Sequence, residues 1–115
     1  MGEIRTKEVD DLLCVLASLD DEDVVFSLLE DLFTIREIRE TSQRLAVARL
    51  LSEGKSYAKI ERETGASATT IARVSKCLSY GSGGYGAALS ALEARRGSQD
   101  STDDSGASGE EDGSV

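Results

Sequence analysis

SYAKIERETGASATTIARVSKCL, residues 56–78, decides the fold because it predicts two short helices joined by a tight turn. Ser56 is suited to cap a first helix that ends near Thr64, and Ser67 is suited to cap the next one. Gly65 lies between them, where an abrupt turn needs the positive φ that glycine adopts without strain. Two helices joined by a short turn that contains glycine form a helix-turn-helix.

Apolar residues in this segment support the same interpretation. We place the helix-turn-helix at residues 56–79 and expect its apolar residues to hold the two helices crossed. They are Ala58 and Ile60 on the first helix and Ile71, Val74 and Leu78 on the second. The opposite face of the second helix is then expected to point outward.

That outward face carries hydroxyls and cations, which suit the major groove of DNA. Hydroxyls bond to base edges and phosphates, a threonine methyl meets a thymine methyl, and arginine pairs bidentately with guanine. Small residues at the start of the helix let it approach closely. The candidate DNA-binding residues are Ser56, Lys59, Ser67, Ala68, Thr69, Thr70, Arg73 and Lys76. A helical hairpin with a merely polar face is the alternative.

The distribution of charge favours DNA, although the net charge of −9 argues against it. A phosphate backbone attracts cations and repels acids. Residues 36–76 carry a net charge of +4, whereas residues 1–35 carry −8 and residues 77–115 carry −5. The positive segment is the one that contains most of the helix-turn-helix, residues 56–76.

Further helices are predicted before this segment. Apolar residues spaced by three and four predict a first helix from near Thr6 to Leu19. The acidic stretch DDED, residues 20–23, supplies a cap and first-turn carboxylates for a second helix. TIRE, residues 34–37, fits a capping box for a third helix over residues 35–52. A last short helix is expected around residues 87–92.

The second helix is apolar on more than one face. Its body, VVFSLLEDLF at residues 24–33, adds Val24, Phe26 and Phe33 to the stripe formed by the other apolar side chains. So short a chain offers few neighbours to cover such a helix, so we expect a partner chain. A central core helix in a monomer is the alternative.

Several classes of protein are excluded by what the chain lacks. It contains no histidine, and Cys14 and Cys77 stand alone, so we expect no metal site, disulfide or cofactor. No catalytic cluster is discernible, so an enzyme is not expected. Apolar runs are short and the N-terminus is charged, so we expect a soluble cytoplasmic protein without membrane contact.

The segment TIREIRETSQRLAVARLLSEGKSYAKIERETGASATTIARVSKCLSYG, residues 34–81, resembles the Trp-repressor superfamily, and in particular its YerC/YecD branch. The resemblance covers roughly residues 5–95. It implies an all-α fold of about six helices and an intertwined homodimer with one helix-turn-helix per chain. We therefore expect a helical DNA-binding domain at residues 1–96, followed by a disordered acidic tail at residues 97–115.

The resemblance also bears on a ligand. Trp repressor grips tryptophan with two arginines and a serine, which fall here on Gln43, Arg73 and Cys77. A glutamine is a neutral partner for a carboxylate, and a thiol bonds weakly. Arg39 and Arg44 are close in sequence but lie on different faces of the helix from Gln43. We therefore do not expect L-tryptophan to be a ligand, and the effector stays unknown.

Two functions from different classes follow. The first is a homodimeric transcriptional regulator that binds a near-palindromic DNA operator through its helix-turn-helix. The alternative is a helical adaptor that binds another protein through the dimer scaffold and the acidic tail, without binding DNA. The local positive charge favours the regulator, and the net charge favours the adaptor.

Overall fold

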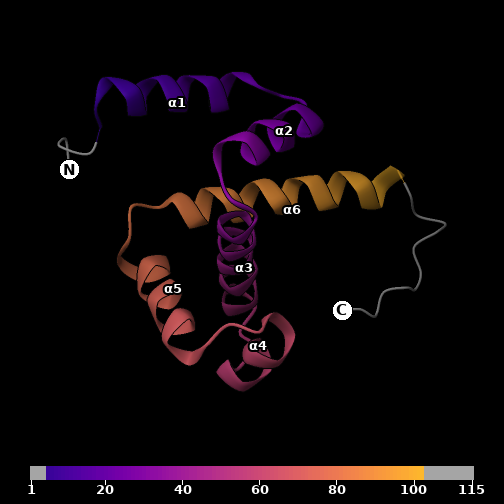
Figure 1. The fold of residues 1–115 in the computed structure, drawn as a ribbon. Coiled ribbons are helices and arrows are strands. Elements are labelled where there is room, and N and C mark those ends of the chain that lie inside the picture. Colours follow the sequence, from indigo (N-terminus) through magenta and orange to yellow (C-terminus); the bar gives the residue numbers. More distant parts are fainter. Residues whose placement is uncertain (1–4, 103–115) are drawn as a thin grey trace. The chain divides into compact units, whose positions relative to one another are not determined.

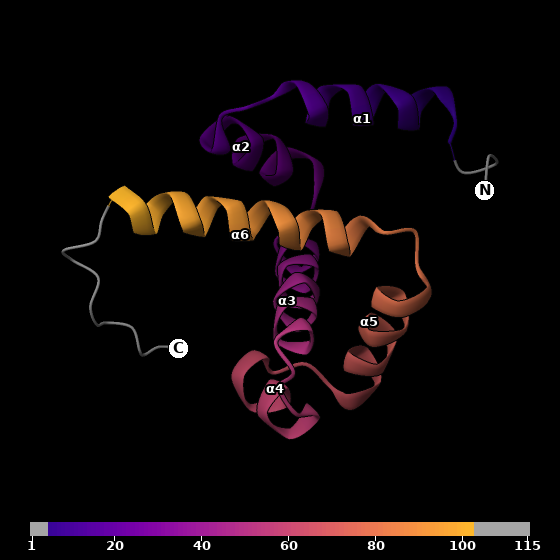
Figure 2. The same ribbon diagram turned by 180° about the vertical axis from the view of Figure 1, so that it is seen from behind.

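The computed structural model describes residues 5–102, which form helices and contain no strand (Figures 1 and 2). The six helices are α1 (Lys7–Ser18), α2 (Glu22–Leu32), α3 (Ile35–Ser52), α4 (Tyr57–Thr64), α5 (Ala68–Tyr80) and α6 (Gly84–Thr102). The predicted all-α class with about six helices is therefore confirmed. Helices of this set are not long and apolar enough to cross a membrane within the part of the chain that the structure describes.

Side-chain caps mark the starts of the first two helices, and the cap of α2 was predicted from the acidic stretch DDED. The hydroxyl of Thr6 accepts a hydrogen bond from the backbone N–H of Val9 at 3.3 Å and so caps α1. The carboxylate of Asp21 accepts one from the N–H of Asp23 at 2.8 Å and caps α2. Each cap satisfies a backbone donor that has no partner inside the helix.

The capping box before α3 is reciprocal, as predicted. The backbone N–H of Glu37 donates to the hydroxyl of Thr34 at 3.0 Å, and the N–H of Thr34 donates to the Glu37 carboxylate at 2.9 Å. The helix then runs from Ile35 to Ser52 and is followed by Gly54 with a φ of 82°. These bonds fix where the longest predicted helix begins.

The chain divides into two compact units, residues 1–40 and residues 41–115. In the described part of the first unit, neither α1 nor α2 contains a buried residue. Large apolar side chains there stay open to solvent, with Phe26 52%, Leu32 50% and Ile35 69% exposed. Within the first unit, these apolar side chains are therefore left uncovered.

The second unit contains a hydrophobic core that supports the helix-turn-helix. Its buried residues are Val47, Ala48, Leu50, Ile60, Ala66, Ile71 and Val74, with Leu51, Leu78, Tyr85 and Leu89 packed against them. The predicted core position Ala58 is wrong, because this residue is exposed. Ala58 lies two residues before the buried Ile60, which turns it about 200° away around α4. Ala66, in the turn, is buried.

The last helix is longer than predicted. Instead of a short helix over residues 87–92, α6 spans Gly84–Thr102 and continues past the expected end of the domain at residue 96. The segment ALSALEARR, residues 88–96, consists almost entirely of strong helix formers, which favours the helix from residue 92 as far as residue 96. The predicted disordered tail at residues 97–115 therefore overlaps the helix at its start. Residues 103–115 lie outside the described part of the chain.

Candidate nucleic-acid interface and adjoining pocket

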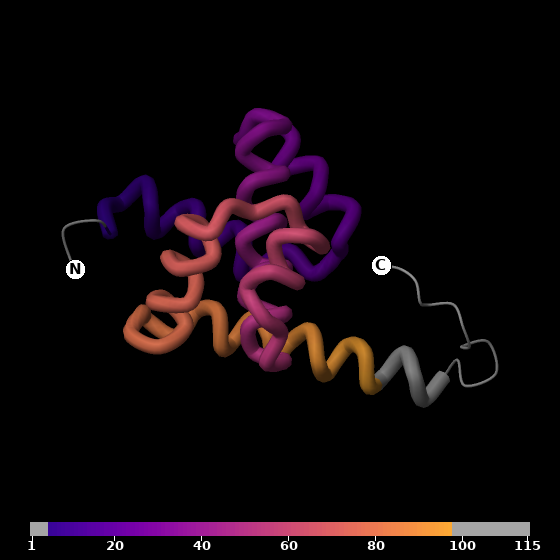
Figure 3. The backbone as a smooth tube through the Cα atoms, turned by 90° about the horizontal axis from the view of Figure 1, so that it is seen from below, coloured from indigo at the N-terminus to yellow at the C-terminus, as the bar shows by residue number. Residues whose placement is uncertain are grey.

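The turn between α4 and α5 has the geometry that its glycine predicts. Gly65 adopts the left-handed conformation, with φ 75° and ψ 4°, and its N–H donates to the carbonyl of Glu61 at 2.9 Å. The next residue, Ala66, is buried in the core. Figure 3 shows the backbone passing from one helix to the next through a short connection. A residue with a Cβ would be strained at that φ, so the turn depends on glycine.

Serines cap both helices of the motif. The hydroxyl of Ser56 accepts from the N–H of Lys59 at 3.2 Å, and that of Ser67 accepts from the N–H of Thr70 at 3.1 Å. The Ser67 hydroxyl also donates to the Thr70 hydroxyl at 3.1 Å. Three of the candidate hydroxyls are therefore engaged in holding helix ends, and Thr70 is half-buried rather than fully outward.

The exposed face of α5 combines a hydroxyl with two cations. Thr69, Arg73 and Lys76 are all exposed and follow each other at intervals of four and three residues, which places them on one side of the helix. Ala68 is exposed at the start of the same helix. The helix has the sequence ATTIARVSKCLSY and contains no acidic residue. We call Thr69, Arg73 and Lys76 the recognition stripe.

Lys59, on α4, is already paired. Its Nζ lies 2.8 Å from the Oε2 of Glu63, one helical turn further along. The hydrogen bond from Lys59 is the main cause that lowers the pKa of Glu63. Glu63 therefore compensates the charge of Lys59 locally.

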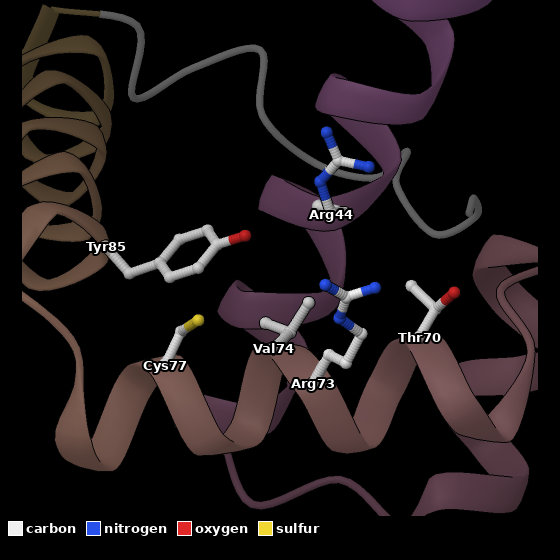
Figure 4. A pocket seen from close by; sticks show the side chains of 6 residues that line it. All are labelled: Arg44, Thr70, Arg73, Val74, Cys77 and Tyr85. Atoms are coloured by element: carbon white, nitrogen blue, oxygen red, sulfur yellow. The ribbon is translucent and has the colours of Figure 1, made fainter. Parts of the chain in front are cut away.

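A pocket of about 410 Å³ adjoins the recognition stripe (Figure 4). Its lining comes from α3, α5 and α6 and consists of Arg44, Thr70, Arg73, Val74, Cys77 and Tyr85. In Figure 4 the side chain of Arg73 extends from α5 toward α3, and the hydroxyl of Tyr85 is directed toward the two arginines. Arg73 therefore belongs both to the pocket and to the edge of the exposed face.

The pocket has the chemistry of an anion site. Among the described residues, the guanidinium groups of Arg44 and Arg73 have no ion-pair or hydrogen-bond partner. Two unpaired guanidinium groups beside the Tyr85 hydroxyl suit a carboxylate or a phosphate.

Of the three residues that the resemblance aligns with the ligand-binding residues of Trp repressor, Gln43 does not belong to the pocket. Its Nε2 donates to the backbone carbonyl of Thr64 at 3.0 Å. Gln43 and Arg44 do face different sides of α3, but it is Arg44 that lines the pocket, together with Cys77. Neighbouring residues on a helix project about 100° apart, which is why only one of the two faces the pocket. Arg44 therefore gives the pocket a second positive charge beside that of Arg73.

Comparison with known proteins agrees with this architecture. The model of the family described as Trp repressor protein matches residues 7–93. The protein named "Uncharacterized protein YerC" from Bacillus subtilis (strain 168) is 48% identical over 89 residues, which cover 77% of this chain and 86% of that protein. Both the matched family and this relative are those that the sequence resemblance indicated.

Two solved structures share the fold. A TrpR-like protein from Eubacterium eligens ATCC 27750 has a TM-score of 0.77 and 39% identity, and the match covers 81% of this chain and 96% of that one. A Staphylococcus aureus protein has a TM-score of 0.76 and 35% identity, with 80% and 92% of the two chains covered. Members of the Trp repressor-like family are regulatory DNA-binding proteins and not enzymes. The helix-turn-helix, the six helices formed by residues 5–102 and these matches together establish that the chain belongs to the Trp repressor family, as a YerC-type member.

Proposed function

We propose that the protein is a homodimeric transcriptional regulator that binds a specific DNA operator by placing α5 in the major groove. The recognition stripe carries this proposal. It presents two cations and a hydroxyl on a helix without acids, directly after a tight turn and next to the small residue Ala68. Such a helix start approaches base edges closely, while its cations contact phosphates.

Dimer formation is supported by the uncovered side chains of the first unit. Phe26 and Leu32 on α2 and Ile35 at the start of α3 are each at least half exposed in a single chain. Burying such surface against a second copy is favourable in proportion to the apolar area removed from water. A symmetric dimer with two recognition helices about 34 Å apart reads two half-sites in successive major grooves, so we expect a near-palindromic operator.

Selection of bound sequences from a pool of random duplexes tests the proposal directly. We expect enrichment of a near-palindrome, whereas an adaptor without DNA binding gives no enriched sequence. The recognition stripe is then tested with Lys76→Ala, which is expected to reduce the slope of log affinity against log salt by about 1. Thr69→Ala is expected to change the preferred base at one position of each half-site.

Lys7→Ala is the matched control, because it removes an equal charge from α1, where Lys7 pairs with Asp11 at 3.4 Å. This variant should keep the affinity and salt slope of the wild type. If Lys76→Ala behaves like Lys7→Ala and Thr69→Ala leaves the operator unchanged, α5 is not the DNA-binding surface.

The adaptor remains the second candidate because one observation favours it. The same exposed side chains of α2 that suit a second copy also suit another protein. Retention on random duplex DNA at low salt separates the two functions, since only a DNA binder is held there and released as salt rises.

A further inference from the structure

A hydrogen bond connects α3 with the turn of the helix-turn-helix. The side-chain Nε2 of Gln43 donates to the backbone carbonyl of Thr64 at 3.0 Å, and the bond is partly shielded from solvent. The two residues are 21 positions apart, so the bond joins separate elements of the second unit. It is therefore a tertiary contact at the base of the recognition helix.

Thr64 is the point where α4 ends, and its carbonyl has no partner within the helix. The Thr64 hydroxyl donates to the carbonyl of Ile60 at 2.8 Å and accepts from the N–H of Ala66 at 3.1 Å. Gly65 follows in the left-handed conformation. The turn is thus bonded to α4 through local contacts, and Gln43 adds its bond to α3.

The hydrogen bond from Gln43 to Thr64 can restrict the orientation of α5, because a hydrogen bond has a preferred direction. Ile60, Ala66 and Ile71 hold the two helices by apolar packing, which has no preferred direction. A hydrogen bond to a carbonyl weakens steeply when its angle changes. The 13 residues of α5 extend about 20 Å from the turn, so a swing of about 10° displaces its far end by about 3 Å. A displacement of that size breaks contacts in a groove.

We propose that Gln43 is a positioning residue that fixes the turn and thereby sets the angle at which α5 is presented to DNA. This role rests on the proposed DNA binding and adds to it a residue that does not touch DNA. Gln43 acts through the Thr64 carbonyl, and its contribution is present in the free protein. The helix-turn-helix then has its DNA-binding geometry before DNA is bound.

The test combines amide hydrogen exchange in the free protein with affinity for one duplex at several salt concentrations. Gln43→Met keeps a side chain of similar length and removes the donor. We expect amide exchange at Gly65 and Ala66 to rise about fivefold, while exchange at the core residues Ile60 and Ile71 changes less. Fivefold corresponds to the loss of one hydrogen bond of about 1 kcal/mol.

Affinity for the duplex is expected to fall by a similar factor with an unchanged salt slope, since no phosphate contact is lost. Gln43→Glu gives a second test in the exchange measurement, because it keeps the shape but presents only acceptors to the carbonyl. Ser52→Ala is the control. It removes the bond of 2.7 Å from the Ser52 hydroxyl to the Arg49 carbonyl on the same helix, away from the turn.

Each outcome decides the matter. Faster exchange confined to the turn, together with weaker DNA binding at the same salt slope, supports the positioning role. Unchanged exchange at the turn, or a rise equal to that of the core, overturns it, because Gln43 then contributes only general stability. Faster exchange with wild-type affinity also overturns it. If the wild type does not bind DNA, the proposed function fails, and the exchange data still show separately whether Gln43 holds the turn.

Discussion

At the scale of single residues, charge compensation divides the cations near the turn into two groups. Lys59 is held by Glu63 at 2.8 Å, whereas Arg73 and Lys76 have no ion-pair partner among the described residues. An exposed pair of this kind contributes little to stability. Its expected effect on DNA binding is larger, because a phosphate would have to compete with Glu63 for Lys59.

Glu63→Gln is therefore expected to strengthen binding to duplex DNA at low salt and to steepen the salt dependence, because Lys59 becomes available to a phosphate. Glu61→Gln is the matched control, since it removes the same charge from α4 at an exposed position. The control should gain affinity only through the change in net charge. Affinity titrations over a salt series measure both variants, and equal salt slopes would show that Lys59 does not contact DNA.

At the scale of helices, α3, α5 and α6 together form the pocket, and their arrangement decides what it binds. The second arginine is Arg44 rather than a residue at position 43, so its guanidinium enters from another side of α3. Cys77, a weak donor and acceptor, is also among the lining residues. A ligand gripped in the manner of Trp repressor does not find the same set of partners here.

We predict that L-tryptophan does not act as a corepressor. Calorimetry should show no saturable binding of L-tryptophan in the micromolar range, and operator affinity should be the same with and without it. Arg44→Gln serves as the comparison for any anion that does bind, because it removes a charge from the pocket and leaves the recognition stripe intact. Saturable binding of tryptophan that tightens the DNA complex would prove the prediction wrong.

At the scale of the whole molecule, association and net charge matter most. We expect an obligate homodimer, in which folding and association are one process. Leu29→Asp places a charge among the apolar side chains of α2 and should cause unfolding as well as dissociation. Light scattering and circular dichroism measure the two effects.

Ser27→Asp is the control for this dimer prediction. It adds the same charge to the same helix at an exposed polar position and should leave a folded dimer. A well-folded monomer of the wild type at micromolar concentration would contradict the prediction.

The acidic C-terminal sequence is expected to weaken nonspecific DNA binding. Six acids and no cation lie between Asp100 and Asp112, and they can compete with phosphates for the basic segment. Truncation after Thr102 keeps all of α6 and removes most of these acids. It should raise the affinity for random duplex at low salt, and equal or weaker binding would exclude the effect. A full-length variant in which these acids are changed to the corresponding amides tests whether their charge, and not the length of the chain, lowers the affinity for random duplex.

The sequence by itself determined where most helices begin and end. Asp21, Thr34, Ser56 and Ser67 were each predicted as caps, and each bonds a backbone N–H two or three residues further on. Such interactions depend only on neighbouring residues, so they can be predicted without knowledge of the rest of the fold. The left-handed turn at Gly65 was predictable for the same reason.

The sequence also predicted Ile60, Ile71 and Val74 in the core, but only the tertiary structure decided which way several other residues face. Ala58 was expected in the core and is exposed, and the pocket contains Arg44, while Gln43 bonds to the turn. Whether such a residue is buried, lines the pocket or bonds to the turn depends on how the helices, among them α3, α5 and α6, pack against one another. Adjacent residues on a helix project about 100° apart. An assignment that is wrong by one position therefore places Gln43 in the pocket instead of Arg44.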